Sequence, residues 1–312
     1  MPFLAPDIGI DLGTENINVY VKGRGIVISE PSLVVLDRTN THTVKAVGDE
    51  ARFLYGRTPD DLIAVSPIHN GQVADFDIAE LMFKYFIRKA VGVSYLGKPR
   101  IIVSVPCGMD DVNRKALTEA VRMAGVKHVF LIEKPFAAAI GTGLPVYDPI
   151  GNLVVDIGAG TTDVAVISLG GLVVSQSVQV GGNKFNDAIA DYLRRECSIL
   201  VGEQTAENIK KDLASAMPLD EDRSILVRGV NQLNTSAGTV QFTAAQAHEA
   251  VRPACAAIVK AIRWVLERTP PELSADIMKS GIHLLLKNIT DQTPRILQPL
   301  ASEGLGMGTV SS

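Results

Sequence analysis

The stretch Leu153-Val-Val-Asp156-Ile-Gly158-Ala-Gly160-Thr161-Thr162-Asp163 is an apolar run that ends in aspartate, followed by a glycine-threonine turn and a second run. A similar stretch, Ile8-Gly-Ile-Asp11-Leu-Gly13-Thr14, stands near the start of the chain. In both places an apolar strand follows, then a turn through glycines, then another strand. The two aspartates are separated by about half of the 312 residues. The sequence therefore predicts two related halves, each beginning strand–turn–strand–turn–strand.

The rest of the chain alternates strand and helix patterns. Arg100–Val105 is typical of a buried strand, and helices are predicted after Asp77, Asp111 and Thr205. Thr243-Ala-Ala-Gln246 predicts a capping box before a long helix. Interleaved strands and helices indicate an α/β fold with partly parallel sheets.

Composition excludes several classes of protein. The chain carries 30 Lys+Arg and 34 Asp+Glu, a net charge of −4, which argues against nucleic-acid binding by bulk charge. Hydrophobic residues make up 46% of the chain, enough for sizeable cores. The 3 cysteines and 5 histidines are widely spaced, so we expect no disulfide framework and no metal cluster, and a reducing cytoplasm fits. No signal peptide is recognisable, and the uncharged stretch Val164–Asn183 predicts a β-hairpin instead of a membrane span.

A strand–Gly–Thr–strand hairpin can wrap a phosphate, since glycine lets backbone N–H groups approach closely and threonine adds a donor. Two such hairpins could hold a polyphosphate. Asp11 and Asp156, at the strand ends, suit an Mg²⁺ ion bound through its waters. Either motif alone is equally a tight turn with a capping aspartate, and it is the duplication that favours the phosphate interpretation. Neither motif is a Walker or Rossmann loop.

These motifs resemble those of the actin, Hsp70 and sugar-kinase superfamily, and more closely those of the MreB/Mbl family of bacterial actins. The similarity extends from about residue 7 to about residue 282. Further matching strings are Gly56-Arg-Thr-Pro59, Ala74-Asp-Phe-Asp77, Leu131-Ile-Glu-Lys-Pro135, Gly181-Gly-Asn-Lys-Phe185 and Glu267-Arg-Thr-Pro-Pro-Glu-Leu273.

The resemblance implies an actin-like α/β fold of two lobes and four subdomains. Their expected ranges are 1–30 plus 68–143 for IA, 31–67 for IB, 144–182 plus 243–282 for IIA, and 183–242 for IIB, with 283–312 as a divergent C-terminal segment. It also implies ATP and Mg²⁺ in a central cleft, and filaments of this chain beneath the cytoplasmic membrane that organise cell-wall elongation and rod shape. Met1–Leu4 and Tyr95-Leu96 are candidate membrane anchors, or equally parts of a core.

The resemblance also implies roles for individual residues. Asp11 and Asp156 would lie near the metal, and Glu133 would position and deprotonate the attacking water. Without the resemblance, Glu133 is equally an exposed ion-pair partner of Lys134. The nucleotide would contact the first loop, the second loop and a helix that follows, through Gly13, Thr14, Glu15, Asn16, Gly158, Ala159, Gly160, Thr161, Thr162, Glu207, Asn208, Ile209 and Lys210. By themselves, Glu207 and Lys210 are an ordinary i, i+3 pair.

The chain departs from the family pattern at three places. Glu15 replaces an alanine beside the phosphates, Lys134 replaces a second acid, and His283-Leu-Leu-Leu-Lys-Asn-Ile-Thr290 replaces a strand with a Gly-Gly-Gly turn that faces the nucleoside. A frameshifted or recombined C-terminus and a divergent, nucleotide-insensitive paralogue both explain the last difference. Loss of the strand after Gly281 would expose a sheet edge.

Three classes of function fit the pattern. The first is an ATP-binding filament protein with weak ATPase activity. The second is another ATP-dependent protein of the superfamily, although the chain lacks the substrate domain of a chaperone and the catalytic aspartate of a sugar kinase. The third is a structural subunit without nucleotide control.

Overall fold

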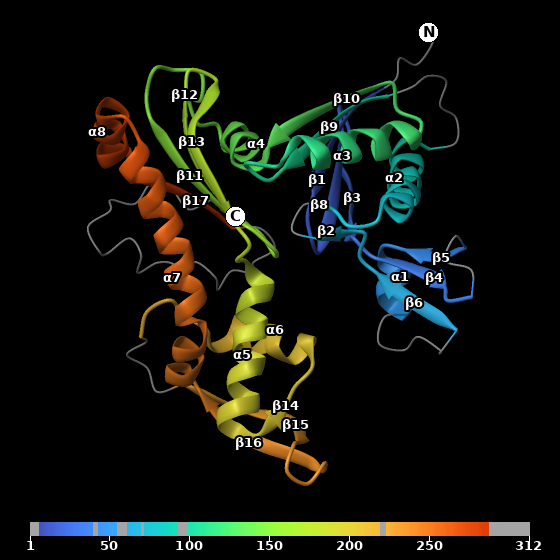
Figure 1. The fold of residues 1–312 in the computed structure, drawn as a ribbon, viewed down its shortest axis with the longest axis vertical. Helices are drawn as coiled ribbons and strands as arrows, with labels where there is room; N and C mark the ends of the chain where they lie inside the picture. The colour runs from blue at the N-terminus through green and yellow to red at the C-terminus, as the bar shows by residue number, and fades with distance from the viewer. Residues whose placement is uncertain are drawn as a thin grey trace. The chain divides into compact units, whose positions relative to one another are not determined.

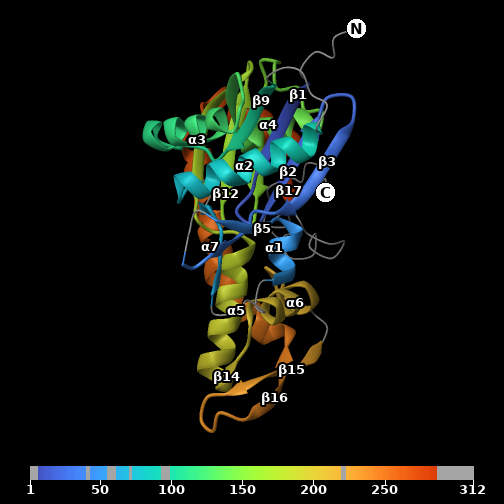
Figure 2. The same ribbon diagram turned by 90° about the vertical axis from the view of Figure 1, so that its right-hand side faces the viewer.

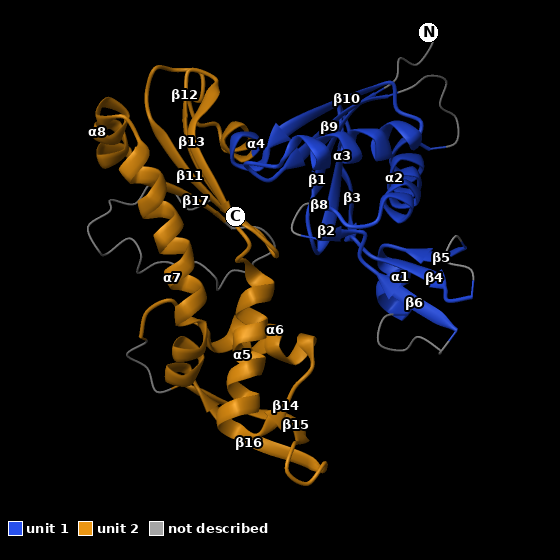
Figure 3. Ribbon diagram, viewed as in Figure 1, with its two compact units in different colours: residues 1–137 blue, residues 138–312 orange. Residues whose placement is uncertain are grey.

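The computed structural model describes residues 6–39, 43–54, 61–69, 72–92, 99–218 and 223–286. The chain divides into two compact units, residues 1–137 and 138–312, each with its own sheet and hydrophobic core (Figure 3). The candidate membrane anchors and residues 287–312 lie outside the described residues. The four-subdomain division stays a prediction.

The first unit is built on a five-stranded sheet of order β10-β9-β1-β2-β3 (Figure 1). Pairing is antiparallel between β1 and β2 and between β2 and β3, and parallel between β1 and β9 and between β9 and β10. Alternate residues of β1 (Ile8, Ile10 and Leu12) are buried in the core. Asp11 therefore lies on the opposite face. The strands are β1 Asp7–Leu12, β2 Asn16–Val21, β3 Gly25–Pro31, β9 Arg100–Val105 and β10 His128–Glu133.

Two amphipathic helices contribute the other half of this core, α2 (Phe76–Val91) and α3 (Asp111–Met123). The Asp75 side chain accepts the Ile78 N–H at 3.0 Å, and the Asp110 side chain accepts the Asn113 N–H at 2.8 Å. Prediction of the helix starts at Asp77 and Asp111 was therefore wrong by one or two positions, because an aspartate just upstream provides the N-cap in both helices.

A small insert follows β3. Its sheet has the order β5-β4-β6, from β4 Val34–Asp37, β5 Val44–Val47 and β6 Leu62–Val65, with helix α1 (Asp49–Leu54) beside it. Two short strands, β7 (Ile68–His69) and β8 (Gln72–Val73), lead to α2. The buried Glu30 of β3 joins insert and helix, since its carboxylate contacts Lys89 of α2 at 2.7 Å and accepts the Asp49 N–H of α1 at 3.4 Å.

The second unit repeats this plan. Its sheet has the order β13-β12-β11-β17, antiparallel from β11 through β13 and parallel between β11 and β17. The duplicated strand–turn–strand–turn–strand is thus confirmed, and Val164–Asn183 contains the predicted hairpin. The strand after Gly281 is present, so this edge of β11 is covered. The bounds are β11 Asn152–Ile157, β12 Thr162–Ser168, β13 Gly171–Val178 and β17 Ile282–Leu286.

The remaining elements of the second unit pack beside this sheet or form a second, smaller one. Helices α5 and α7 share the main core with β11 and β12, and β14, β15 and β16 pair beyond the end of α5 (Figures 1 and 2). The capping box at Thr243 is confirmed by mutual hydrogen bonds with Gln246. Helix α4 (Lys134–Gly141) belongs to both units, since the division falls between residues 137 and 138 (Figure 3). The other bounds are α5 Gly182–Cys197, β14 Ile199–Leu200, α6 Glu203–Leu213, β15 Ser224–Asn231, β16 Ala237–Thr243, α7 Ala244–Arg268 and α8 Pro271–Ser280.

Within the described ranges, none of the helices combines the length and hydrophobicity needed to cross a bilayer.

Candidate functional site

The two predicted phosphate loops have the same backbone turn. The Gly13 N–H donates to the Asn16 carbonyl at 3.1 Å, and the Gly158 N–H donates to the Thr161 carbonyl at 2.8 Å. A Cβ atom on Gly13 would lie 2.3 Å from the Asn16 oxygen, so a side chain there requires the turn to move. The duplication therefore includes the hydrogen bond that closes the loop, as well as the sequence.

Asp11 is oriented by a serine on the neighbouring parallel strand. Ser104 is the register partner of Asp11, and its hydroxyl donates to the Asp11 carboxylate at 2.5 Å while accepting the Leu12 N–H at 3.3 Å. Ser104 is buried, and sequence reasoning missed it. Its signal was a single hydroxyl within the apolar strand Arg100–Val105.

Asp156 occupies the same strand position in the second unit, with different neighbours. Its register partners are Asp163 on β12 and Leu285 on β17, so a leucine stands where the first unit has Ser104. Asp156 and Asp163 are both buried, and as opposite residues of an antiparallel pair their side chains share one face of the sheet. The Thr161 hydroxyl donates to Asp163 at 3.3 Å. These are hard oxygen donors, the type that Mg²⁺ prefers.

Glu133 ends β10 and lies beside α3. Arg114 of α3 donates to its carboxylate at 2.7 Å, with both side chains about one-third exposed. The register pairs Glu133 with the buried Val105, on the helix-bearing face, whereas Asp11 is on the opposite face. Lys134, the alternative partner, is itself buried, and the ion pair of Glu133 in the described part of the chain is with Arg114.

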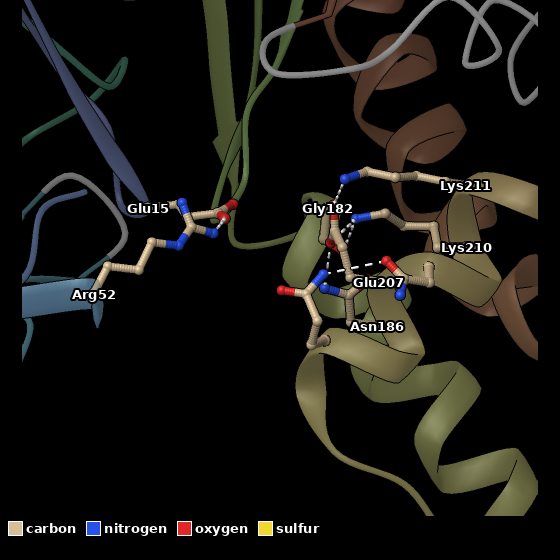
Figure 4. A network of polar contacts seen from close by, with 9 residues as sticks. Glu15, Arg52, Gly182, Asn186, Glu207, Lys210 and Lys211 are labelled. Carbon is tan, nitrogen blue, oxygen red and sulfur yellow. Dashed lines mark hydrogen bonds and ion pairs between the residues drawn. The ribbon is translucent and has the colours of Figure 1, made fainter. Parts of the chain in front are cut away.

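Glu207 and Lys210 form a largely buried network on α6 (Figure 4). The Glu207 carboxylate contacts Lys210 at 2.7 Å and Lys211 at 2.9 Å, and accepts a hydrogen bond from Asn186 of α5 at 2.8 Å. Burial would raise the pKa of Glu207, but the hydrogen bonds from its two lysines and Asn186 outweigh burial and lower the pKa from 4.5 to about 2. The two side chains are only 18% and 13% exposed, unlike those of an ordinary surface pair.

The network is joined to the second loop through the start of α5. The Lys210 ammonium donates to the Gly182 carbonyl at 3.2 Å, and the Gly182 N–H donates to the Gly158 carbonyl at 3.0 Å. A Cβ atom on Gly181 would lie 2.5 Å from the Gly158 oxygen, which explains the glycine at this position. The structure thus brings together the second loop and the Glu207–Lys210 pair, and adds Gly181, Gly182 and Asn186 to the predicted residues.

Several other predicted contacts have structural partners of their own. The Thr162 hydroxyl donates to the Val180 carbonyl at 2.7 Å. Ile209 is buried in the core, and the exposed Asn208 accepts a hydrogen bond from Gln204 at 3.2 Å. Ala159 accepts the Asn183 N–H at 2.9 Å through its carbonyl. Thr14, Asn16 and Gly160 are half-buried in their loops.

Glu15, the unusual residue of the first loop, is paired with a cation of the insert. Arg52 of α1 lies 3.7 Å from the Glu15 carboxylate (Figure 4). Ser32 fixes the loop backbone, because its N–H donates to the Glu15 carbonyl at 2.8 Å and its hydroxyl to the Gly13 carbonyl at 2.9 Å. Neither Arg52 nor Ser32 was predicted. Among the described residues, no group of three or more His, Cys, Asp or Glu could by itself hold a metal ion.

Comparison with known proteins identifies the relatives of this architecture. The structure of MreB5 of Spiroplasma citri bound to ADP superposes on this chain with a TM-score of 0.88 and 31% sequence identity. The superposition covers 100% of this chain and 93% of the MreB5 chain. The MamK double helical filament superposes with a TM-score of 0.76 over 99% of this chain and 94% of the MamK chain. At 20% sequence identity, this similarity shows a shared fold and no more. The two sheets with their repeated hairpins therefore define an actin-like protein.

The sequence comparison is more specific. The MreB/Mbl protein family model matches residues 5–293. The cell shape-determining protein Mbl of Bacillus subtilis is 46% identical over 278 residues, 89% of this chain and 83% of the relative. The cell shape-determining protein MreB of Escherichia coli K12 is 45% identical over 292 residues, 91% and 84% of the two chains. The chain belongs to the MreB/Mbl family, and the match extends some ten residues beyond the expected limit near residue 282.

Proposed function

We propose that the chain is an ATP-binding, actin-like cytoskeletal protein that assembles into filaments and takes part in determining cell shape. The observation that carries this proposal is the repeated loop, closed by the same hydrogen bond at Gly13 and at Gly158. Relatives of the same family are named cell shape-determining proteins, and MreB5 of Spiroplasma citri has been obtained with ADP and with AMPPNP.

ATP would be bound through both loops, with Mg²⁺ near Asp11 and Asp156. Backbone N–H groups of a glycine turn suit phosphate oxygens, and carboxylates suit a water-bridged magnesium ion. The Glu207–Lys210 pair would contact the nucleoside, since the start of α5 connects it with the second loop.

A slow hydrolysis of ATP to ADP and phosphate would accompany filament turnover. Glu133 would orient the attacking water and accept its proton. Arg114 keeps this carboxylate in one orientation. When bound, Mg²⁺ would supply charge neutralisation to the phosphates.

The partners follow from the family. We infer that the chain self-associates, lies in the cytoplasm against the inner face of the membrane, and guides the cell-wall elongation machinery. An anchor of two or three apolar side chains binds a bilayer weakly in a single subunit. In a filament the anchors of many subunits bind together, so the filament is held by avidity.

A second candidate is a structural subunit without nucleotide control. Leu285 stands beside Asp156 where the first unit has the hydrogen-bonding Ser104. A divergent C-terminal segment that no longer supports the nucleoside would leave filament formation independent of ATP.

Pelleting of the purified full chain with ATP, with ADP and without nucleotide separates these functions. Sedimentation that depends on ATP supports the first proposal, and equal sedimentation in all three samples supports the second. A chain that stays in the supernatant under all conditions, with or without anionic vesicles, argues against both.

A further inference from the structure

The first loop contains a negative charge that the second loop lacks. The two loops align from their closing hydrogen bonds, so Glu15 takes the position of Gly160 in the second loop. Phosphates are anions, and a carboxylate at such a loop repels them unless a cation compensates. Arg52 is that cation, 3.7 Å away on α1.

Hydrogen bonds fix the backbone on both sides of this ion pair. Ser32 holds the backbone of the first loop through two hydrogen bonds, so the Glu15 side chain leaves the loop in a set direction. Arg52 is held by α1, where its N–H donates to the Gly48 carbonyl at 3.0 Å. The carboxylate of Glu30 accepts the N–H of Asp49, at the start of the same helix. The guanidinium is thus presented to the loop by packed elements.

The pair itself is loose. At 3.7 Å, with Arg52 55% and Glu15 37% exposed, it belongs to the class of ion pairs that contribute little to stability and exchange partners readily. A guanidinium binds phosphate with two parallel hydrogen bonds, which are stronger than a single loose contact to a carboxylate.

We propose that Arg52 is a phosphate-binding residue of the nucleotide site and that Glu15 is its internal competitor. Terminal phosphates of the nucleotide take the guanidinium from Glu15, so that phosphate binding and the contact between insert and loop are coupled. This inference rests on the proposed function, because it assigns the first loop to nucleotide phosphates. It concerns residues of the first unit alone.

The test is equilibrium titration of the full chain and its variants with ATP, ADP and AMP in the presence of Mg²⁺. Arg52→Ala should weaken ATP binding by about 3- to 10-fold, and Glu15→Ala should strengthen it by a similar factor, the range expected for one partly solvated charge pair. Both effects should decrease from ATP to ADP and be smallest for AMP. Arg52→Lys should restore part of the affinity, which a purely structural role would not predict.

Glu119 and Arg122 provide the matched control. They form an exposed Arg–Glu ion pair of 2.7 Å within α3, with 53% and 52% exposure. Glu119→Ala and Arg122→Ala should leave all three affinities unchanged.

The outcomes are separable. If the unsubstituted chain binds ATP and Arg52→Ala binds it equally well, the role of Arg52 is wrong and the proposed function stands. The same holds if Glu15→Ala weakens binding, or if AMP responds as strongly as ATP. If the unsubstituted, folded chain binds no ATP, the proposed function fails and this inference with it.

Discussion

The carboxylate of Glu133 accepts a hydrogen bond of 2.7 Å from the guanidinium of Arg114. This contact links the end of strand β10 to helix α3, which packs on it. The contact limits the rotation of Glu133, and a fixed position is one condition that a general base requires. The ion-pair partner of Glu133 is thus 19 residues away in sequence, whereas the adjacent Lys134 is buried.

Glu133→Ala should reduce ATP turnover by roughly 10²–10⁴-fold, the usual contribution of a positioned general base, with ATP affinity nearly unchanged. Arg114→Ala should reduce turnover by about 10-fold, because Glu133 stays but loses its orientation. Single-turnover rates and binding titrations measure the two quantities separately. A large loss of affinity with normal turnover at saturation would contradict the role of Glu133.

Asp156→Asn should abolish hydrolysis if Asp156 lies near the metal as we propose, since its carboxylate is replaced by a neutral side chain of the same shape. The variant retains the volume of the buried residue, so folding is less affected than by Asp156→Ala. In EDTA, where no Mg²⁺ compensates the charge of Asp156, the nucleotide affinity of the variant should be no lower than that of the unsubstituted chain, because a carboxylate that repels the phosphates has been removed. Asp191→Asn, on the exposed face of α5, serves as the control. Unchanged turnover in a preparation free of other ATPases shows that Asp156 is not near the metal.

The stability of the second unit should depend on Glu207 and on pH. The pKa of Glu207 is lowered from 4.5 to about 2. The ionised carboxylate therefore stabilises the fold fully above pH 4.5, and this contribution is lost as the pH falls toward about 2. Glu207→Gln should therefore destabilise the chain at neutral pH, by at most about 3 kcal/mol, and by much less near pH 2 to 3. Urea unfolding at several pH values measures this difference. If Glu207→Gln lowered the free energy of unfolding by the same amount at every pH, the loss of the ionised network would not be the cause.

Recognition of the base should be poor. The resemblance implies a Gly-Gly-Gly turn after the strand that follows Gly281, whereas here strand β17 ends at Leu286 and the sequence continues as Lys287-Asn-Ile-Thr290. A glycine-free chain cannot approach a flat base as closely. We expect weak ATP binding with little discrimination against GTP, because each lost contact costs about 1–3 kcal/mol. Replacing residues 283–312 by the C-terminal segment of a typical MreB protein should restore affinity and adenine preference. Micromolar ATP affinity with a strong preference over GTP in the unmodified chain would refute this expectation.

Local sequence signals were sufficient for most of the fold. The repeated Asp–Gly–Thr strings predicted both hairpins, and the box at Thr243 predicted the start of α7, because these features depend on residues close together in the chain. The helix starts at Asp75 and Asp110 were misassigned because a second aspartate, one or two residues further on, is an equally good N-cap by type, and only backbone geometry selects one. The strand after Gly281 was in doubt because it lacks the family's residues, yet an apolar strand pairs with β11 whatever its family.

The candidate site could be predicted only in part. Asp11, Asp156 and Glu133 stand in recognisable strings, but Ser104, Arg114 and Arg52 reach their partners through pairings distant in sequence. No periodicity indicates which of many arginines meets a given carboxylate. Asn186 was missed for the same reason, since it meets Glu207 only when α5 packs on α6.

Whether this chain binds Mg²⁺-ATP is decided by an equilibrium titration of the purified chain with Mg²⁺-ATP. We predict saturable binding of one nucleotide per chain, weakened when Mg²⁺ is removed by EDTA. Absence of saturable binding, in a chain whose circular dichroism shows it to be folded, would show that the proposed nucleotide site is wrong.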